Sequence, residues 1–164
     1  VELQVTSDAV YAIVRGAGEV RSTASNETLP FEVTYGTGVF KVSSDGEPLW
    51  TADVPTGVAM AATDDGVYLS FGASGGTFGD TTFTDWGEGD VFVAKLDAAT
   101  GKGAYILQTG GQGNEAFTAS VFADPDSGDL FYAAQLHSHP GYYDPLIVDT
   151  HSVNDGVDLV IARL

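Results

Sequence analysis

The sequence predicts an all-β protein built from about three propeller-like blades of antiparallel strands. Short runs rich in Val, Ile, Phe, Tyr and Thr alternate with turn-forming residues, and helical periodicity is almost absent. In addition, one strand-like phrase recurs along the chain. A β-sandwich is the alternative fold, because regularly spaced short strands are typical of both architectures.

Clusters in which Gly lies beside or near Asp mark the turns between these strands. Glycine adopts a positive φ at no steric cost, and Asp accepts hydrogen bonds from backbone N–H groups that follow it. Tight turns are therefore predicted at residues 43–48, 63–68, 124–129 and 153–158.

Two series of landmarks repeat along the chain. The first is a basic residue near the end of a strand, at Lys41, Lys95 and Arg163. The second is an apolar and aromatic pair that begins a strand after a turn, at Val10-Tyr11, Val67-Tyr68 and Leu130-Phe131. Both recur at intervals of roughly 55 to 65 residues, which fits about four short strands and their loops. The approximate units are therefore 1–63, 64–126 and 127–164, the last of them incomplete.

The stretch DVFVAKLD, residues 90–97, predicts a strand that is buried on both faces. Successive side chains of a strand point to opposite faces, and here both sets are largely apolar. A strand with one solvated face would alternate apolar with polar residues instead. This sheet is therefore expected to lie between two others.

An ordered series of motifs runs through residues 90–135. FVAKLD is followed by a Gly turn, an aromatic strand, GG-x-G at 110–113, an apolar strand, and an Asp- and Gly-containing turn that leads into Leu130-Phe131-Tyr132. In this order the series resembles the bacterial SBBP-type β-propeller repeat. The preceding unit matches less fully, since PTGVA stands where GG-x-G is expected. Together the matching parts cover about two thirds of the chain.

The resemblance implies an exported or surface-exposed protein with an interaction or adhesion role, and it implies no reaction. Closed propellers usually have about four to eight blades, whereas this chain supplies about three. An open terminal blade would expose a sheet edge that pairs readily with another strand. We therefore expect protein partners or self-association through open sheet edges, within a longer protein or between two copies that close a ring.

Composition excludes several classes of function. The 23 acidic residues against 6 basic residues leave a net charge of −17, which repels nucleic acid and anionic lipid surfaces. No apolar run is long enough to insert into a membrane, and the absence of Cys excludes disulfides, thiolate metal sites and a Cys nucleophile. The acidity favours an extracellular or cell-surface location.

Three carboxylates in the segment ADPDSGD are the candidate calcium ligands: Asp124, Asp126 and Asp129. Calcium prefers oxygen ligands, but Gly128 and Asp129 stand in the reverse of the order found in an EF-hand loop. The favoured interpretation is a hairpin turn that the Asp residues shape. No other cofactor is expected.

His137, His139 and His151 are candidate ligands for a transition metal. The segment HSHPGYYDP contains two prolines and a glycine, so an irregular surface loop with solvated histidines is the favoured interpretation. A G-x-S-x-G motif is absent as well, and we therefore expect no enzymatic activity.

Three aromatic residues in predicted loops are candidate binding residues: Trp86, Tyr142 and Tyr143. Each could stack on a sugar ring or anchor a protein partner, and packing between blades is the alternative. Asn26 begins the sequon Asn-Glu-Thr and is a candidate N-glycosylation site.

These observations predict a non-catalytic structural or interaction scaffold whose loops 72–90 and 136–156 bind partners, with carbohydrate as a further ligand class. The alternatives are a metal-dependent or carbohydrate-active enzyme, with its site in the loop rich in His and Asp, and a lectin-like sugar-binding module.

Overall fold

All the strand pairs of the structure, a computed structural model, are antiparallel, and the described residues form no helix. The all-β prediction is therefore confirmed. The structure describes residues 2–16, 18–22, 25–26, 28–31, 36–55, 58–85, 89–109, 118–124, 127–137, 146–148, 151–153 and 157–163.

The first sheet has the strand order β1-β2-β5-β6, with a separate hairpin formed by β3 and β4. Its turn residues agree with the sequence analysis, since Gly46 has a φ of 87° in the turn between β5 and β6. The bounds are β1 Glu2–Val5, β2 Ala9–Arg15, β3 Gly18–Arg21, β4 Thr28–Phe31, β5 Thr37–Ser43 and β6 Pro48–Val54.

The second and third sheets follow the same plan. The second sheet has the order β12-β11-β8-β7 and the third has the order β13-β14-β17. The strands of the second sheet and its hairpin are β7 Ala59–Thr63, β8 Gly66–Ala73, β9 Gly76–Phe78, β10 Thr81–Phe83, β11 Asp90–Asp97 and β12 Gly103–Thr109. Those of the third sheet and its hairpin are β13 Thr118–Ala123, β14 Leu130–His137, β15 Leu146–Val148, β16 His151–Val153 and β17 Val157–Arg163.

Each sheet is thus a meander with a two-stranded hairpin inserted between its second and third strands. The chain passes from one sheet to the next between residues 54 and 59 and again between 109 and 118. These divisions lie one strand earlier than the approximate unit limits at 63 and 126. A repeat in the sequence defines the period but not the point at which each unit begins. Backbone hydrogen bonding defines that point, because β7 and β13 pair with the strand that follows them.

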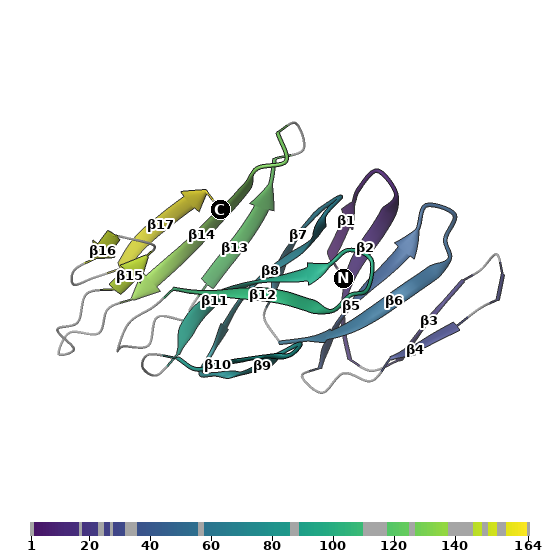
Figure 1. Cartoon of the computed structure of the whole chain (residues 1–164), viewed down its shortest axis with the longest axis horizontal. Helices are drawn as coiled ribbons and strands as arrows, with labels where there is room; N and C mark the ends of the chain where they lie inside the picture. Colours follow the sequence, from purple (N-terminus) through teal and green to yellow (C-terminus); the bar gives the residue numbers. More distant parts are fainter. Residues whose placement is uncertain are drawn as a thin grey trace.

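The three sheets stack, with the second sheet between the other two (Figure 1). We call the face that carries Tyr11, Tyr68 or Phe131 the front of its sheet and the opposite face the back. The front of the first sheet packs against the back of the second, and the front of the second packs against the back of the third. The described sheets form no closed ring, which agrees with the sandwich alternative.

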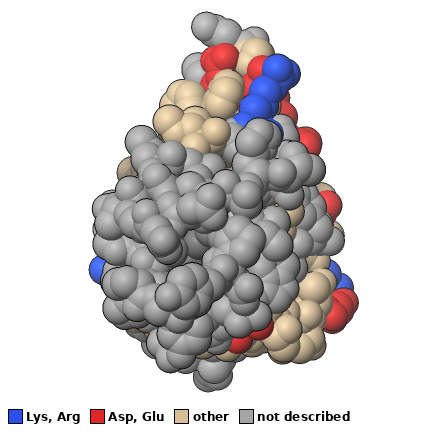
Figure 2. All heavy atoms as spheres, turned by 90° about the vertical axis from the view of Figure 1, so that its left-hand side faces the viewer, with Lys and Arg blue, Asp and Glu red and all other residues tan. Residues whose placement is uncertain are grey.

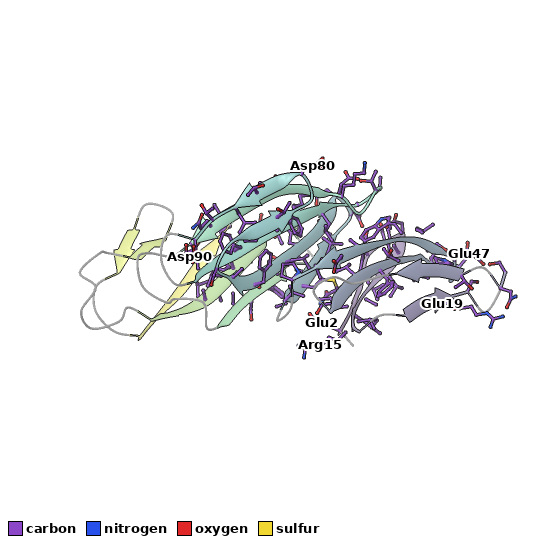
Figure 3. All side chains as sticks on the ribbon, turned by 90° about the horizontal axis from the view of Figure 1, so that it is seen from below. Glu2, Arg15, Glu19, Glu47, Asp80 and Asp90 are labelled. Atoms are coloured by element: carbon purple, nitrogen blue, oxygen red, sulfur yellow. The ribbon has the colours of Figure 1, made fainter. Side chains whose placement is uncertain are left out.

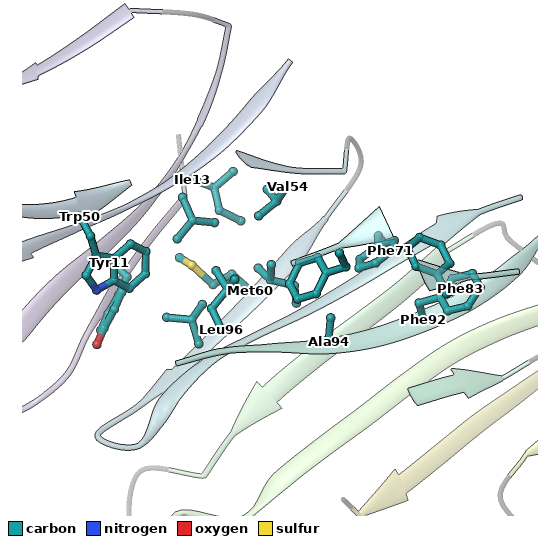
Figure 4. Packing of buried hydrophobic residues seen from close by; sticks show 14 of the residues in the cluster. Tyr11, Ile13, Trp50, Val54, Met60, Phe71, Phe83, Phe92, Ala94 and Leu96 are labelled. Atoms are coloured by element: carbon teal, nitrogen blue, oxygen red, sulfur yellow. The ribbon is translucent and has the colours of Figure 1, made fainter. Parts of the chain in front are cut away.

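The larger core fills the first of these two interfaces (Figure 4). Tyr11, Ile13 and Trp50 project from the front of the first sheet, and Met60 and Leu96 project from the back of the second. The smaller core joins Tyr68 and Ala61 to Val121 and Leu130 of the third sheet. Burial of these apolar surfaces is the main term that holds the stack together.

Strand β11 confirms the prediction of burial on both faces. Phe92, Ala94 and Leu96 belong to the core shared with the first sheet, and Val91 and Val93 on the other face are also buried. The period-two pattern of apolar residues therefore identified the central sheet correctly.

Candidate functional site

The same kind of ion pair recurs at one end of all three sheets. A carboxylate in the turn between the first and second strands pairs with a basic residue of the third long strand. The pairs are Asp8–Lys41 at 3.5 Å, Asp65–Lys95 at 2.8 Å and Asp129–Arg163 at 2.7 Å. The repeated basic residue of the sequence therefore closes the turn of its own sheet.

Strand register explains why these groups meet. Tyr11 lies opposite Lys41, and Tyr68 lies opposite Lys95 on the adjacent strand. The ammonium groups consequently lie over the aromatic rings, 5.4 and 5.1 Å from the ring centroids. Such cation–π contacts favour the charged form of lysine, so each ammonium is held both by a carboxylate and by a ring.

The pKa values of Asp8 and Asp65, in the turns of the first two sheets, are lowered. The hydrogen bond from Lys95, followed by one from Thr63, lowers the pKa of Asp65. A hydrogen bond from Thr6, together with the charge of Lys41, lowers the pKa of Asp8. Hydrogen bonds of this kind stabilise the charged carboxylate. These acids therefore act as turn-forming anions.

A groove of about 770 Å³ lies where these turns converge. Its volume falls within the range of ligand-binding clefts. The first sheet contributes Val5 and Ser7, the second contributes Asp64 and Asp65, and the third contributes Phe122 and Asp124. The backbone N–H and Oγ of Ser7 both donate to Asp64 Oδ1, at 3.3 and 2.9 Å. This contact ties the first sheet to the second at the edge of the groove.

The groove combines apolar surface with negative charge. Val5 and Phe122 are both large exposed apolar residues, whereas the described lining includes acidic residues and no Lys or Arg. Acidic side chains also extend along the rest of the molecule, and Figure 3 labels Glu19 and Glu47 toward one end. A groove of this chemistry suits a cation on an aliphatic stem, because long basic side chains bury their stems and keep their charge in water.

The candidate calcium residues Asp124 and Asp129 form a hairpin turn. Asp124 Oδ2 accepts a hydrogen bond from Ser127 Oγ at 2.8 Å, and the Gly128 N–H donates to the Asp124 carbonyl at 2.8 Å. Asp129 is bound to Arg163. In Figure 2, basic and acidic side chains lie next to each other at the upper end of the view. Asp126 lies outside the described residues, and no group of three or more acids or histidines within them could hold a metal.

The remaining predicted site residues are mostly outside the described part of the chain. His139, Trp86, Tyr142 and Tyr143 belong to this group. The backbones of His137 and His151 lie in β14 and β16, so His137 ends a strand instead of belonging to an irregular loop. Ladder pairing with β17 extends β14 to this residue.

Asn26 is exposed, with a φ of 64°, and its side chain accepts a hydrogen bond from Arg21. Asn tolerates this left-handed conformation better than most residues. Exposure is compatible with the predicted glycosylation, which stays a prediction.

Part of the loop 72–90 contributes to the core. Phe78 and Phe83 of the hairpin β9–β10 are buried, and their ring centroids lie 6.2 and 6.0 Å from that of Phe71. The groove between the turns was missed in the sequence analysis. The sequence feature that could have indicated the groove is the equivalence of the three turns, because equivalent turns lie at the same end of stacked sheets.

Comparison with known proteins finds no match, either to a protein-family model or to a curated protein. Among the described residues there is no helix suited to crossing a membrane.

Proposed function

We propose that this chain is a non-catalytic interaction scaffold of an extracellular or cell-surface protein, and that its groove binds a basic peptide segment of a partner. The convergence of three equivalent turns on one groove carries this proposal. The acidic composition and the resemblance to the SBBP-type repeat support the location.

The surroundings of the groove suit a preorganised binding surface. The turns are tied by their own ion pairs, and the strands that follow them are packed into two apolar cores. A rigid site loses little conformational entropy when a ligand binds. The described polar groups around the groove are engaged in turn contacts, as the pairs of Asp65 with Lys95 and of Asp124 with Ser127 illustrate. Binding therefore accounts for this arrangement better than catalysis does.

Charge should govern the interaction with such a peptide. A Lys or Arg side chain can lay its stem against Val5 and Phe122 while its charge lies near Asp64 and Asp124. The net charge of −17 attracts a cationic partner from a distance, and added salt screens this attraction. Binding should accordingly weaken as ionic strength rises.

Titration calorimetry with the peptide Lys-Leu-Lys-Leu-Lys tests the proposal. We expect binding that weakens with salt, and none with Glu-Leu-Glu-Leu-Glu. Asp64→Asn should weaken binding by about threefold or more, since it removes a charge within the groove and keeps an acceptor for Ser7. Asp80→Asn is the matched control, because it makes the same charge change at an exposed position outside the groove lining.

Equal effects of Asp64→Asn and Asp80→Asn would show that the peptide responds only to overall charge and would contradict a groove site. Amide shifts on adding Ca²⁺ that are confined to residues 124–129 would favour the calcium alternative, and hydrolysis of a glycoside would contradict a non-catalytic role.

A further inference from the structure

Equivalent positions on the fronts of the three sheets differ sharply in exposure. One such position lies two residues before the basic residue of each ion pair. It is occupied by Val39 in the first sheet, Val93 in the second and Ile161 in the third. The exposed fractions are 0%, 1% and 67%. At this position the fronts of the first two sheets are covered by the next sheet, whereas the front of the third sheet is exposed.

Equivalent positions on the backs show the opposite order. Leu3, Met60 and Val121 lie on the first strands of the three sheets, each opposite the residue that follows the front-face aromatic. Their exposed fractions are 61%, 2% and 7%. The backs of the second and third sheets are covered by the preceding sheet. The back of the first sheet is exposed at Leu3 on β1, whereas Phe40 on β5, which belongs to the same face, is buried with 1% exposure.

The two outer faces that expose an apolar residue at these positions are therefore one front and one back. Within the chain a front packs on a back twice, in the first and second interfaces. We propose that a second copy of this chain continues this packing, with the front of the third sheet of one copy on the back of the first sheet of the other. This inference specifies a partner for the proposed scaffold. It uses the outer faces, on which Val5 and Phe122 also line the groove.

The contacts of the first interface indicate how such copies would meet. Lys41 Nζ and Trp50 Nε1 both donate to the carbonyl of Ala98, at 3.1 and 3.0 Å, in the turn between β11 and β12. Gly101 of this turn lies under Trp50, because a Cβ placed there would be 2.6 Å from the indole Cε3. The turn of the second sheet is thus the docking point for the first sheet.

The first sheet has an equivalent turn, in which the Glu47 side chain accepts hydrogen bonds from Ser22 and Ser25 but the glycine has open space beside it. Gly46 stands between β5 and β6 with a φ of 87°, as Gly101 does between β11 and β12 with a φ of 70°, but a Cβ on Gly46 would meet no atom within 4 Å. Arg163 is the equivalent of Lys41, and its side chain is 66% exposed against 8% for Lys41. In the proposed assembly Arg163 approaches this turn, where the exposed Asp45 supplies an opposite charge.

A second copy of the chain can cover both outer faces, because it presents one face of each kind. A front and a back are different surfaces, so the contact is heterologous. Two copies close on each other only if the rotation between them closes, and otherwise further copies add to the same two faces. The apolar residues that this contact would cover include Leu3 and Ile161, which are among the large exposed apolar residues of the described chain. Covering them removes apolar surface from water, which favours association.

Sedimentation equilibrium of the isolated chain and two variants tests this assembly. The unmodified chain should form dimers or longer assemblies that dissociate on dilution. Leu3→Glu and Ile161→Glu should each raise the dissociation constant of self-association by about tenfold or more, because a carboxylate would be buried in the contact. An equimolar mixture of the two variants should regain association as a heterodimer, since it contains one intact back and one intact front. Leu107→Glu, at an exposed position of the second sheet, should leave self-association unchanged.

Three results would overturn the proposal: a monomer at every concentration, association that neither variant weakens, or a mixture that stays monomeric. The last result would indicate contact between like faces. Circular dichroism spectra that match the unmodified chain show that the exposed substitutions keep the fold. Neither position lines the groove, so peptide binding by the two variants tests the proposed function separately.

Discussion

The first interface and the open front of the third sheet contain equivalent residues in opposite surroundings. Lys41 is buried between a ring, a carboxylate and the carbonyl of Ala98, whereas Arg163 keeps its carboxylate and is exposed. All three sheets thus contain the ion pair, but they differ in whether a neighbouring sheet covers it. This difference teaches that the turns close within a single sheet, while the energetic value of each residue depends on what packs against its face.

The largest effect is expected at Trp50, which anchors the first interface. Its ring lies 5.9 Å from Tyr11, it covers Gly101, and it donates to Ala98. Trp50→Ala should lower the free energy of unfolding by about 3 to 5 kcal/mol, because it leaves a cavity and removes one of the two hydrogen bonds to the Ala98 carbonyl. Urea unfolding followed by circular dichroism measures this loss.

Trp50→Phe serves as the second variant if the alanine variant does not fold. It retains an aromatic ring but removes the indole N–H and part of the ring volume, so its cost should be about 1 to 2 kcal/mol. Equal losses for the two variants would contradict packing as the main contribution.

A pair of glycines gives the next largest effect and the cleanest comparison of the two environments. Gly46→Ala should cost about 1 to 2 kcal/mol, since only the positive φ opposes it. Gly101→Ala should cost roughly 1 to 3 kcal/mol more, because its Cβ would also collide with Trp50. Urea midpoints of the two variants measure the difference. Equal midpoints would show that the turn of the second sheet does not dock on Trp50 in solution.

The smallest effect concerns the pair of Asp65 and Lys95, whose carboxylate is exposed to solvent. The pKa of Asp65 is lowered by the hydrogen bond from Lys95, so its stabilising contribution is present above the unfolded pKa of about 3.9 and is lost as pH falls below it. Asp65→Asn should therefore lower stability by no more than about 1 kcal/mol at pH 7, since solvent screens the pair. The difference from the unmodified chain should disappear toward pH 2.

Urea midpoints of both proteins across this pH range provide the measurement. Asp80→Asn is the control, because it makes the same substitution in the turn between β9 and β10. A difference between Asp65→Asn and the unmodified chain that grew on acidification would reverse the expected sign and refute the assignment.

Local patterns predicted the features that depend on neighbouring residues. The turn at residues 43–48 was predicted from its Gly and Asp, and Gly46 there adopts the positive φ that glycine permits. The central strand at residues 90–97 was identified from apolar residues on both of its faces. Asp124 and Asp129 were placed in a turn for the same local reason, and their contacts agree.

Features that join distant segments were not predicted. Phe78 and Phe83 stand in a stretch that reads as a polar, Gly-rich loop, yet their hairpin packs into the first interface. The groove requires three turns far apart in the sequence to meet, and no single turn indicates it. The unit limits were displaced by one strand because periodicity does not reveal which neighbour a strand pairs with.

The sequence by itself determined that the chain forms strands, where it turns, and that one strand motif returns three times. These properties depend on backbone conformation and on the alternation of side chains along a strand, both of which are local. Only the tertiary structure decided which faces are covered, because the residues at equivalent positions, such as Val39 and Ile161, are both β-branched and apolar. Burial is a property of the neighbouring sheet, and a repeated motif cannot specify where the stack of sheets stops.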